Sequence, residues 1–227
     1  GDLIIKVERD GKPVELCIQK ELLDSAKKLG IFVRDSMAGI GTITYLNPEN
    51  DSFGALGHGV EDSETMTLLP LKTGTIMPSE VVDRQIGQRG QPGALKGIFD
   101  TNKTLGTITS NTSHGLFGTA SGLKGRLPAI EVATPEQIHT GKATILSNVQ
   151  GKFVEEFEIE IEKLFPSPSA DGRNMLILVT DPRLLELTGG IVQGMSGSPI
   201  LQDGRIIGAV THVLVNDPTR GYGIFIT

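Results

Sequence analysis

The residues best suited to chemistry form a glycine-rich motif near the end of the chain, GMSGSP at residues 194–199. A serine hydroxyl is a weak nucleophile until a neighbouring base removes its proton. Acyl transfer also needs backbone N–H groups that converge on the oxyanion of the tetrahedral intermediate. Glycine on both sides of a serine lets the chain turn sharply and leaves those amides uncovered. We therefore predict Ser196 as a nucleophile, with the N–H groups of Gly194 and Ser196 as its oxyanion hole. The alternative is an ordinary glycine-rich turn.

A base for this serine must be a histidine, and the chain has four. His58 ends an apolar run and is flanked by glycines, in ALGHGV, and it lies in the other half of the chain from Ser196. This position predicts a base that faces the nucleophile across a cleft between two halves. His114 and His139 lie in polar, turn-like segments and are expected to be exposed. His212 lies in an apolar segment, where it either lines a substrate pocket or has a structural role.

The segment around His212 is the predicted substrate-binding strand. It belongs to GRIIGAVTHVLV, which follows the nucleophile motif after an Asp-Gly turn. An extended peptide that pairs with a strand edge gains affinity from backbone hydrogen bonds and selectivity from pockets for alternate side chains. We therefore expect Thr211, His212 and Val213 to contact the substrate near the scissile bond.

The elements that must position these residues are short strands. The 227 residues include 29 Gly and 12 Pro, and aromatic residues make up only 4%. Short apolar runs separated by turn residues recur through both halves of the chain, a pattern typical of barrels and sandwiches. Apolar residues also alternate on both sides of Asp10-Gly11, which predicts a β-hairpin. The sequence thus predicts an all-β protein with two strand-rich halves.

Composition argues against several other classes of protein. The net charge is −6 and the basic residues are dispersed, which disfavours binding to nucleic acid or to an anionic membrane surface. No apolar run approaches the roughly 18 residues that a membrane-spanning helix needs. Metal-binding spacings such as HExxH and CxxC are not found, so no cofactor is expected. The single cysteine, Cys17, is expected to be a small strand residue rather than a reactive thiol.

Several longer motifs make the chain similar to the stage IV sporulation protein B family of peptidases. They are FGALGHGV, RGQPGALKGIF, LGTIT and GGIVQGMSGSPILQDGRIIGAVTHV. This family belongs to the chymotrypsin-like clan of serine endopeptidases. The resemblance therefore implies two six-stranded β-barrels with a few short helices, the first over residues 25–133 with the base and the second over residues 134–227 with the nucleophile. It also implies that residues 1–24 are the remnant of a preceding PDZ domain plus a linker. We interpret the lack of the rest of that domain, and of the usual N-terminal anchor, as truncation or self-cleavage.

The resemblance assigns His58 as the base, Ser196 as the nucleophile and Asp181 as the acid that orients the base. The residues alone leave the acid open. In ordinary two-barrel peptidases the acid follows the base within the first barrel, as Asp100 does here. Asp181 precedes a proline, a pattern typical of a helix N-cap, and Asp100 lies in an Asp-Thr-Asn turn. We favour Asp181 on the resemblance.

The resemblance also implies a function. It predicts a serine endopeptidase that makes limited regulatory cleavages in extracytoplasmic protein segments during sporulation signalling. The expected substrate is a regulatory subunit of an intramembrane protease complex, with self-cleavage in addition. The expected location is the space between mother cell and forespore, either secreted or held to the membrane only by the missing anchor. The alternative is a catalytically silent scaffold or binding protein with the peptidase fold. An esterase on an α/β-hydrolase fold is disfavoured because strands follow Ser196 and the histidine precedes it.

Overall fold

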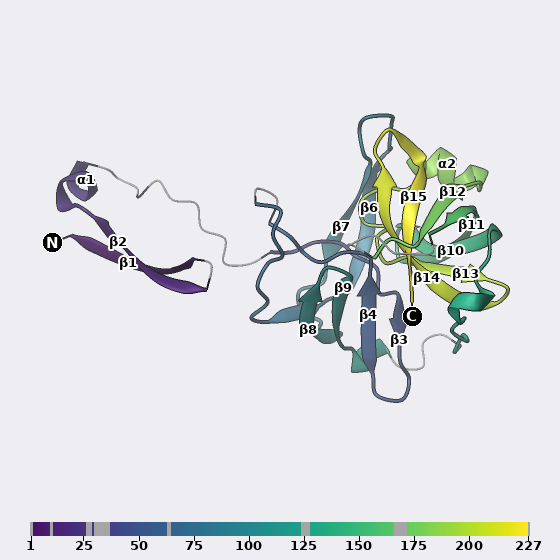
Figure 1. Ribbon diagram of the computed structural model, residues 1–227, viewed down its shortest axis with the longest axis horizontal. Coiled ribbons are helices and arrows are strands. Elements are labelled where there is room, and N and C mark those ends of the chain that lie inside the picture. Colours follow the sequence, from purple (N-terminus) through teal and green to yellow (C-terminus); the bar gives the residue numbers. More distant parts are fainter. Residues whose placement is uncertain are drawn as a thin grey trace. The chain divides into compact units, whose positions relative to one another are not determined.

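The structure is a computed structural model that describes residues 2–9, 11–25, 29, 37–62, 65–123, 128–165 and 172–226. The chain divides into two compact units, Gly1–Gly39 and Ile40–Thr227, which are described separately (Figure 1). Among the described residues, no helix is long and apolar enough to cross a membrane. Both predicted peptidase halves lie mainly in the larger unit.

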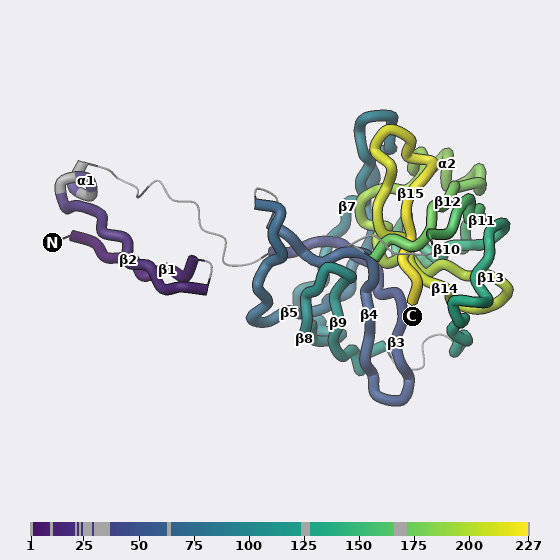
Figure 2. The backbone as a smooth tube through the Cα atoms, in the orientation of Figure 1, coloured from purple at the N-terminus to yellow at the C-terminus, as the bar shows by residue number. Residues whose placement is uncertain are grey.

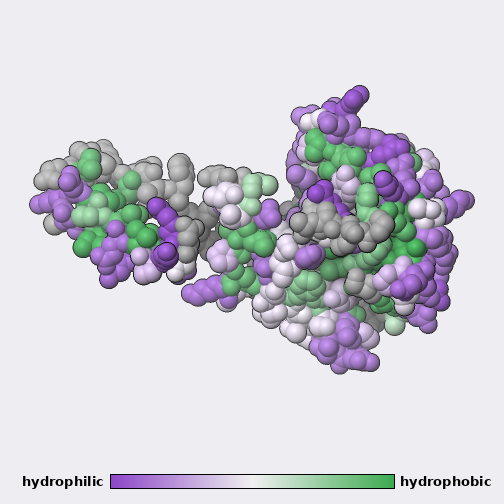
Figure 3. Space-filling model, viewed as in Figure 1, coloured by the Kyte–Doolittle hydropathy of each residue, from purple (hydrophilic) through white to green (hydrophobic). Residues whose placement is uncertain are grey.

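The smaller unit is a β-hairpin followed by a short helix. Strand β1 (Leu3–Arg9) pairs antiparallel with β2 (Lys12–Ile18), and helix α1 (Lys20–Ser25) follows. Gly11 has a φ of 71°, a left-handed conformation that favours glycine in a tight turn. Asp10 lies outside the described residues. Figure 3 shows hydrophobic residues on the surface of this hairpin. The predicted hairpin is confirmed.

The nucleophile half of the larger unit forms a closed six-stranded barrel in the order β10-β11-β12-β15-β14-β13 (Figures 1 and 2). Its strands are β10 (Gly141–Gln150), β11 (Phe153–Leu164), β12 (Met175–Val179), β13 (Pro199–Gln202), β14 (Arg205–Leu214) and β15 (Asp217–Phe225). Along β11, the side chains of Phe157, Ile159 and Ile161 are at most 1% exposed, and the glutamates between them are exposed. This period of two places one face of the strand in the core.

The half that carries His58 forms two sheets. The larger sheet has five strands in the order β3-β4-β9-β8-β5, and the smaller one is the hairpin β6-β7. These strands are β3 (Tyr45–Leu46), β4 (Ser52–Leu56), β5 (Gly74–Ile76), β6 (Ser79–Gln85), β7 (Ala94–Phe99), β8 (Gly106–Thr112) and β9 (Gly115–Thr119).

The hairpin β6-β7 directs hydrogen bonds to the nucleophile half. Val81 and Gly151 exchange two backbone hydrogen bonds, of 3.0 and 2.9 Å, and the N–H of Leu95 donates to the carbonyl of Gln193 at 2.8 Å. Strands β6 and β7 thus pair with each other and bond to the nucleophile half, and they do not join the five-stranded sheet. The described strands of this half therefore do not close into a second six-stranded barrel. The predicted all-β class with two strand-rich halves is confirmed.

Short helices connect the strands, and one of them leads into the nucleophile motif. Helix α2 (Pro182–Thr188) begins after its N-cap Asp181 and ends at Gly189, which has a φ of 74°. Two 3-10 turns, Ser121–Leu123 and Pro135–Gln137, are also described. Leu184 of α2 and Met195 of the motif are fully buried in the barrel's hydrophobic core. The core thus anchors both ends of the segment that presents Ser196.

Candidate active site

The nucleophile motif forms a tight loop between α2 and β13. Gly194 and Gly197 have φ values of 101° and 93°, in a region that residues with side chains rarely adopt. A Cβ atom at Gly197 would also collide with the carbonyl oxygen of Thr42. The backbone conformation around Ser196 therefore requires glycine, as the motif predicted.

The loop leaves Ser196 partly accessible while its neighbour Ser198 faces the core. The N–H of Gly197 donates to the carbonyl of Val210 in β14 at 2.9 Å, which ties the loop to the barrel. Ser196 is partly buried. Ser198 is fully buried, and its hydroxyl donates to Ser147 Oγ at 3.0 Å. Of the two serines in the motif, Ser196 is thus the one placed to react.

The Ser196 hydroxyl lies against the backbone of Gly57, the residue that precedes His58. A Cβ atom on Gly57 would collide with Ser196 Oγ, and Gly57 has a φ of 130°. Strand β4 ends at Leu56, so it delivers the glycine-histidine-glycine segment directly to the nucleophile loop. The structure therefore brings together the His58 motif of one half and the Ser196 motif of the other.

The ring of His58 is exposed and has a defined tautomer. Its Nδ1 lies 2.9 Å from the carbonyl oxygen of Gly59. Because a carbonyl only accepts, Nδ1 carries the proton and Nε2 of the neutral ring carries the lone pair. This is the tautomer that a general base for serine needs. Within the described residues Nε2 and Ser196 Oγ form no hydrogen bond, so base and nucleophile are neighbours that are not engaged.

The N–H groups of the predicted oxyanion hole are also without a described acceptor. Within the described part of the chain, the N–H groups of Gly194 and Ser196 donate no hydrogen bond. The carbonyl oxygens of the same two residues both accept from Thr42, from its Oγ1 at 3.4 Å and from its N–H at 3.3 Å. An oxyanion at these two amides would therefore not compete with an acceptor among the described residues.

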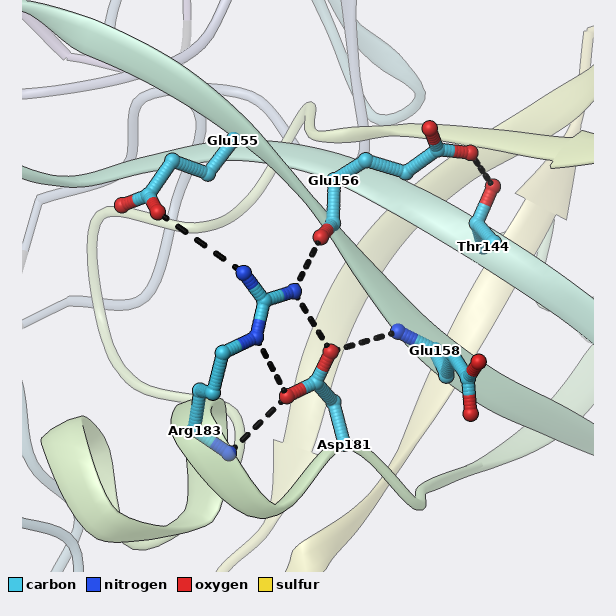
Figure 4. A network of polar contacts seen from close by, with 6 residues as sticks. All are labelled: Thr144, Glu155, Glu156, Glu158, Asp181 and Arg183. Atoms are coloured by element: carbon cyan, nitrogen blue, oxygen red, sulfur yellow. Dashed lines mark hydrogen bonds and ion pairs between the residues drawn. The ribbon is translucent and has the colours of Figure 1, made fainter.

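Asp181 belongs to a different polar cluster, drawn in Figure 4. Its Oδ1 accepts from the N–H and the Nε of Arg183 at 2.9 and 3.2 Å, and its Oδ2 accepts from Arg183 Nη2 at 2.8 Å and from the N–H of Glu158 at 3.2 Å. The Arg183 side chain is the main cause that lowers the pKa of Asp181 to about 2, and the two backbone N–H groups add to it against the effect of burial. The structure thus shows Asp181 as a helix cap that does not contact His58.

Asp100 does not contact His58 either. Its Oδ1 accepts from the N–H of Asn102 at 3.2 Å, and its Oδ2 pairs with Lys103 Nζ at 3.3 Å. Asp100 therefore stabilises its own turn. In this conformation the structure places neither predicted acid at the base, and the Gly59 carbonyl occupies Nδ1 instead.

The predicted substrate strand pairs over different lengths with its two neighbours in the barrel. Strand β14 pairs with β13 only as far as Ala209, whereas on its other side it pairs with β15 as far as Leu214. Among the described strands, the pairing of β13 with β14 thus ends at Ala209. Thr211 is 4% exposed and its hydroxyl donates to the Tyr222 carbonyl at 3.2 Å, so its side chain supports the barrel. His212 and Val213 are partly exposed.

The other histidines are placed differently. The ring centroid of His212 lies 5.2 Å from that of His58, which brings the substrate strand beside the base. His139 Nε2 lies 2.9 Å from Asp203 Oδ2 on an exposed surface. His114 Nδ1 lies 3.0 Å from the Ser113 hydroxyl. Among the described residues, no three His, Cys, Asp or Glu side chains gather as a metal site requires.

Two residues that contact the nucleophile loop were not predicted from the sequence. They are Thr42 and Thr44, in the segment that precedes β3. The only signal for them is a pair of alternating threonines in GTITY, which is typical of any strand. Their role becomes visible only in the hydrogen bonds between the two halves.

Known proteins that are similar to this chain include one family and several solved structures. A search of curated proteins finds no match. Among solved structures, the active form of the Rv3671c protease from M. tuberculosis is similar, with a TM-score of 0.43 and 15% identity over 70% of this chain and 89% of that chain. Its inactive form has a TM-score of 0.40 and 17% identity over 60% and 67% of the two chains. The sequence profile of the SpoIVB peptidase S55 family matches residues 25–227, which include both the His58 and the Ser196 motifs. The chain therefore belongs to the SpoIVB peptidase S55 family and is a serine peptidase.

Proposed function

We propose that this serine peptidase is an endopeptidase with Ser196 as its nucleophile and His58 as its general base. One observation carries the proposal: the Ser196 hydroxyl lies against the residue that precedes His58. The Gly59 carbonyl, at 2.9 Å from Nδ1, keeps the ring in the tautomer whose Nε2 accepts a proton. The proposal requires these two atoms to come into hydrogen-bond contact when a substrate is bound.

The chemistry then follows from the positions of these groups. Nε2 of His58 takes the proton of Ser196 Oγ as the oxygen attacks the scissile carbonyl, and the N–H groups of Gly194 and Ser196 receive the developing oxyanion. The imidazolium then protonates the leaving amine. Water hydrolyses the acyl-enzyme through the same steps in reverse order.

Of the three proposed catalytic residues, the acid is the one that must leave its described position to act. Family resemblance supports Asp181, but its carboxylate is held by four hydrogen bonds from Arg183 and Glu158. To reach His58 it must give up those bonds and displace the Gly59 carbonyl from Nδ1. We propose that the described conformation uses the carbonyl to orient the ring, with Asp181 as the candidate acid of a rearranged state.

The substrate is an extended protein segment that lies along β14 beyond Ala209, where the pairing with β13 ends and where His212 lies next to His58. Binding of this kind suits an endopeptidase, because the segment continues on both sides of the scissile bond. Family membership supports a regulatory role in sporulation signalling, with cleavage of an extracytoplasmic segment of an intramembrane protease complex and self-cleavage. It also supports the PDZ origin of residues 1–24 and an extracytoplasmic location.

Turnover of an internally quenched peptide, selected from a random library with the wild-type chain, tests the proposal. Ser196→Ala is expected to lose cleavage by roughly 10⁶-fold because the acyl-enzyme route is gone. Ser198→Ala removes only a buried bond to Ser147 and is expected to keep most of the activity. Equal losses in both variants would show that the nucleophile is misassigned. A folded wild-type chain that cleaves no peptide would favour the silent scaffold.

A further inference from the structure

The segment that precedes β3, residues 40–44, runs along the nucleophile loop and is called the strap here. Its Thr42 donates to the carbonyls of Gly194 and Ser196, from Oγ1 at 3.4 Å and from N–H at 3.3 Å. Gly197 packs so closely on the strap that a Cβ atom there would collide with the Thr42 carbonyl. The strap therefore contacts residues on both sides of the nucleophile.

One side chain of the strap joins the nucleophile loop to the base strand. The hydroxyl of Thr44 donates to the carbonyl of Gly197 at 2.8 Å and accepts from the N–H of Leu56 at 2.9 Å. Thr44 is only 5% exposed. A hydroxyl has one proton to donate and lone pairs to accept, so this oxygen satisfies both groups at once. A single buried atom thus links two backbone positions that belong to different halves.

These two positions are the immediate neighbours of the reacting residues. Gly197 follows Ser196 directly, and Leu56 lies two residues before His58. The N–H of Thr44 also donates to the Gly54 carbonyl at 2.8 Å, which fixes the strap to β4 in register. Any shift of the base strand relative to the nucleophile loop must therefore break or stretch the bonds of Thr44.

Removal of the hydroxyl leaves two buried polar groups without that partner. A buried donor or acceptor that loses its partner bears its full desolvation penalty, so the loop and the strand are expected to move apart or to admit water. A displacement of about 1 Å between reacting groups is enough to lower a rate by roughly 10²-fold. The effect on the reaction is thus expected to exceed the loss of one hydrogen bond.

We propose that Thr44 is a positioning residue whose hydroxyl sets the distance between His58 and Ser196 by joining Leu56 to Gly197. The proposal rests on the proposed roles of Ser196 and His58. Thr44 does not touch the substrate, because its hydroxyl is buried and both of its bonds go to backbone groups.

The test compares the acylation rate of three variants by a fluorophosphonate, measured well below the melting temperature of each variant. Thr44→Val keeps the shape but removes the hydroxyl, and we expect the rate per folded molecule to fall roughly 10²-fold. Thr44→Ser restores the hydroxyl and is expected to recover most of the rate. Ser147→Ala, which removes a buried hydroxyl bonded to Ser198 at 3.0 Å, is the control for stability alone.

The outcomes separate this inference from the proposed function. If Thr44→Val melts earlier but acylates at the wild-type rate, Thr44 is merely structural and the inference fails. The same holds if Thr44→Ser is as slow as Thr44→Val. If the wild-type chain is not labelled, or Ser196→Ala is labelled equally, the proposed function fails first. A peptide assay adds a second criterion: the positioning role lowers kcat and leaves KM nearly unchanged.

Discussion

Two polar clusters of the nucleophile half, around Ser196 and around Asp181, differ in how fully their hydrogen-bonding groups are used. At Asp181 both carboxylate oxygens accept two hydrogen bonds each. At Ser196 the hydroxyl and the N–H have no partner within the described residues, and the N–H of Gly194 has none either. Satisfied buried groups stabilise a fold, whereas groups that find their partner only in the transition state accelerate a reaction.

The comparison teaches that a strongly shifted pKa in this half is not by itself evidence for catalysis. The pKa of Asp181 is lowered to about 2, mainly by Arg183, yet this carboxylate caps α2. The exposed His58 makes a hydrogen bond from Nδ1 to a backbone carbonyl and lies beside the ring of His212. Geometry around the nucleophile therefore identifies the site better than the size of a pKa shift.

The largest expected effect concerns the base. His58→Ala should lower kcat/KM by roughly 10⁶-fold, because loss of the base costs about as much as loss of the nucleophile. Its melting temperature should stay close to wild type, since the ring is exposed. His139→Ala, which removes an exposed ring paired with Asp203, is the matched control for peptide turnover. Equal losses in the two variants would break the assignment of the Ser196 cluster as the site.

If the described conformation is the one that reacts, the Asp181 cluster should respond in stability rather than in rate. Asp181→Ala removes a buried cap and its bonds to Arg183, and we expect a loss of roughly 2 kcal/mol in the free energy of unfolding. Asp181→Asn keeps an oxygen for the N–H of Arg183 and should lose less. Urea denaturation and peptide turnover of both variants check this. If Asp181→Asn instead loses roughly 10⁴-fold in turnover with unchanged stability, Asp181 is the acid that orients His58.

Low pH should reduce the stability that the Asp181 cluster gives to the fold. The folded-state pKa of Asp181 is lowered from 3.8 to about 2, with Arg183 as the main cause. The unfolded chain therefore binds this proton more readily. The stabilisation is fully present above the unfolded pKa and is lost as the pH falls through the folded pKa, with a size on the order of 2 kcal/mol. Unfolding free energies from about pH 5 down to the lowest pH at which the chain folds measure this slope. An equally steep slope in Asp181→Asn would contradict the assignment.

The smallest effect is expected at the other predicted acid. Asp100 lies in a turn with an exposed lysine partner, so Asp100→Asn should change stability by no more than about 0.5 kcal/mol. Turnover should match wild type. Loss of turnover in this variant alone would show that Asp100, in the same half as His58, is the acid that orients the base. The order of catalytic residues along the chain would then be that of ordinary two-barrel peptidases.

Much of the fold and part of the site were predictable from local patterns. The hairpin signal around Asp10-Gly11 and the helix signal at Asp181-Pro182 are confirmed by the pairing of β1 with β2 and by the cap. The glycines around Ser196 predicted a sharp turn, and the positive φ values of Gly194 and Gly197 confirm it. The sequence implied the approach of Gly57 to Ser196 only indirectly, because the His58 and Ser196 motifs lie in different halves that were expected to face each other across a cleft.

What could not be predicted depends on contacts between distant segments. The pairing of β6-β7 with Gly151 and Gln193 depends on which sheet edges remain free after folding. The double role of Thr44 depends on two backbone groups that meet only in three dimensions. The orientation of His58 by the Gly59 carbonyl is likewise invisible in composition, because every residue carries a carbonyl. The choice of acid stays a prediction.

The most direct test of the central claim is the location of the covalent adduct that a fluorophosphonate forms with the wild-type chain. Mass-spectrometric peptide mapping should find the phosphonyl group on Ser196 alone, and His58→Ala should form this adduct many orders of magnitude more slowly because the serine is no longer deprotonated. An adduct on a different residue, or an adduct on Ser196 that forms equally fast without His58, would contradict the account.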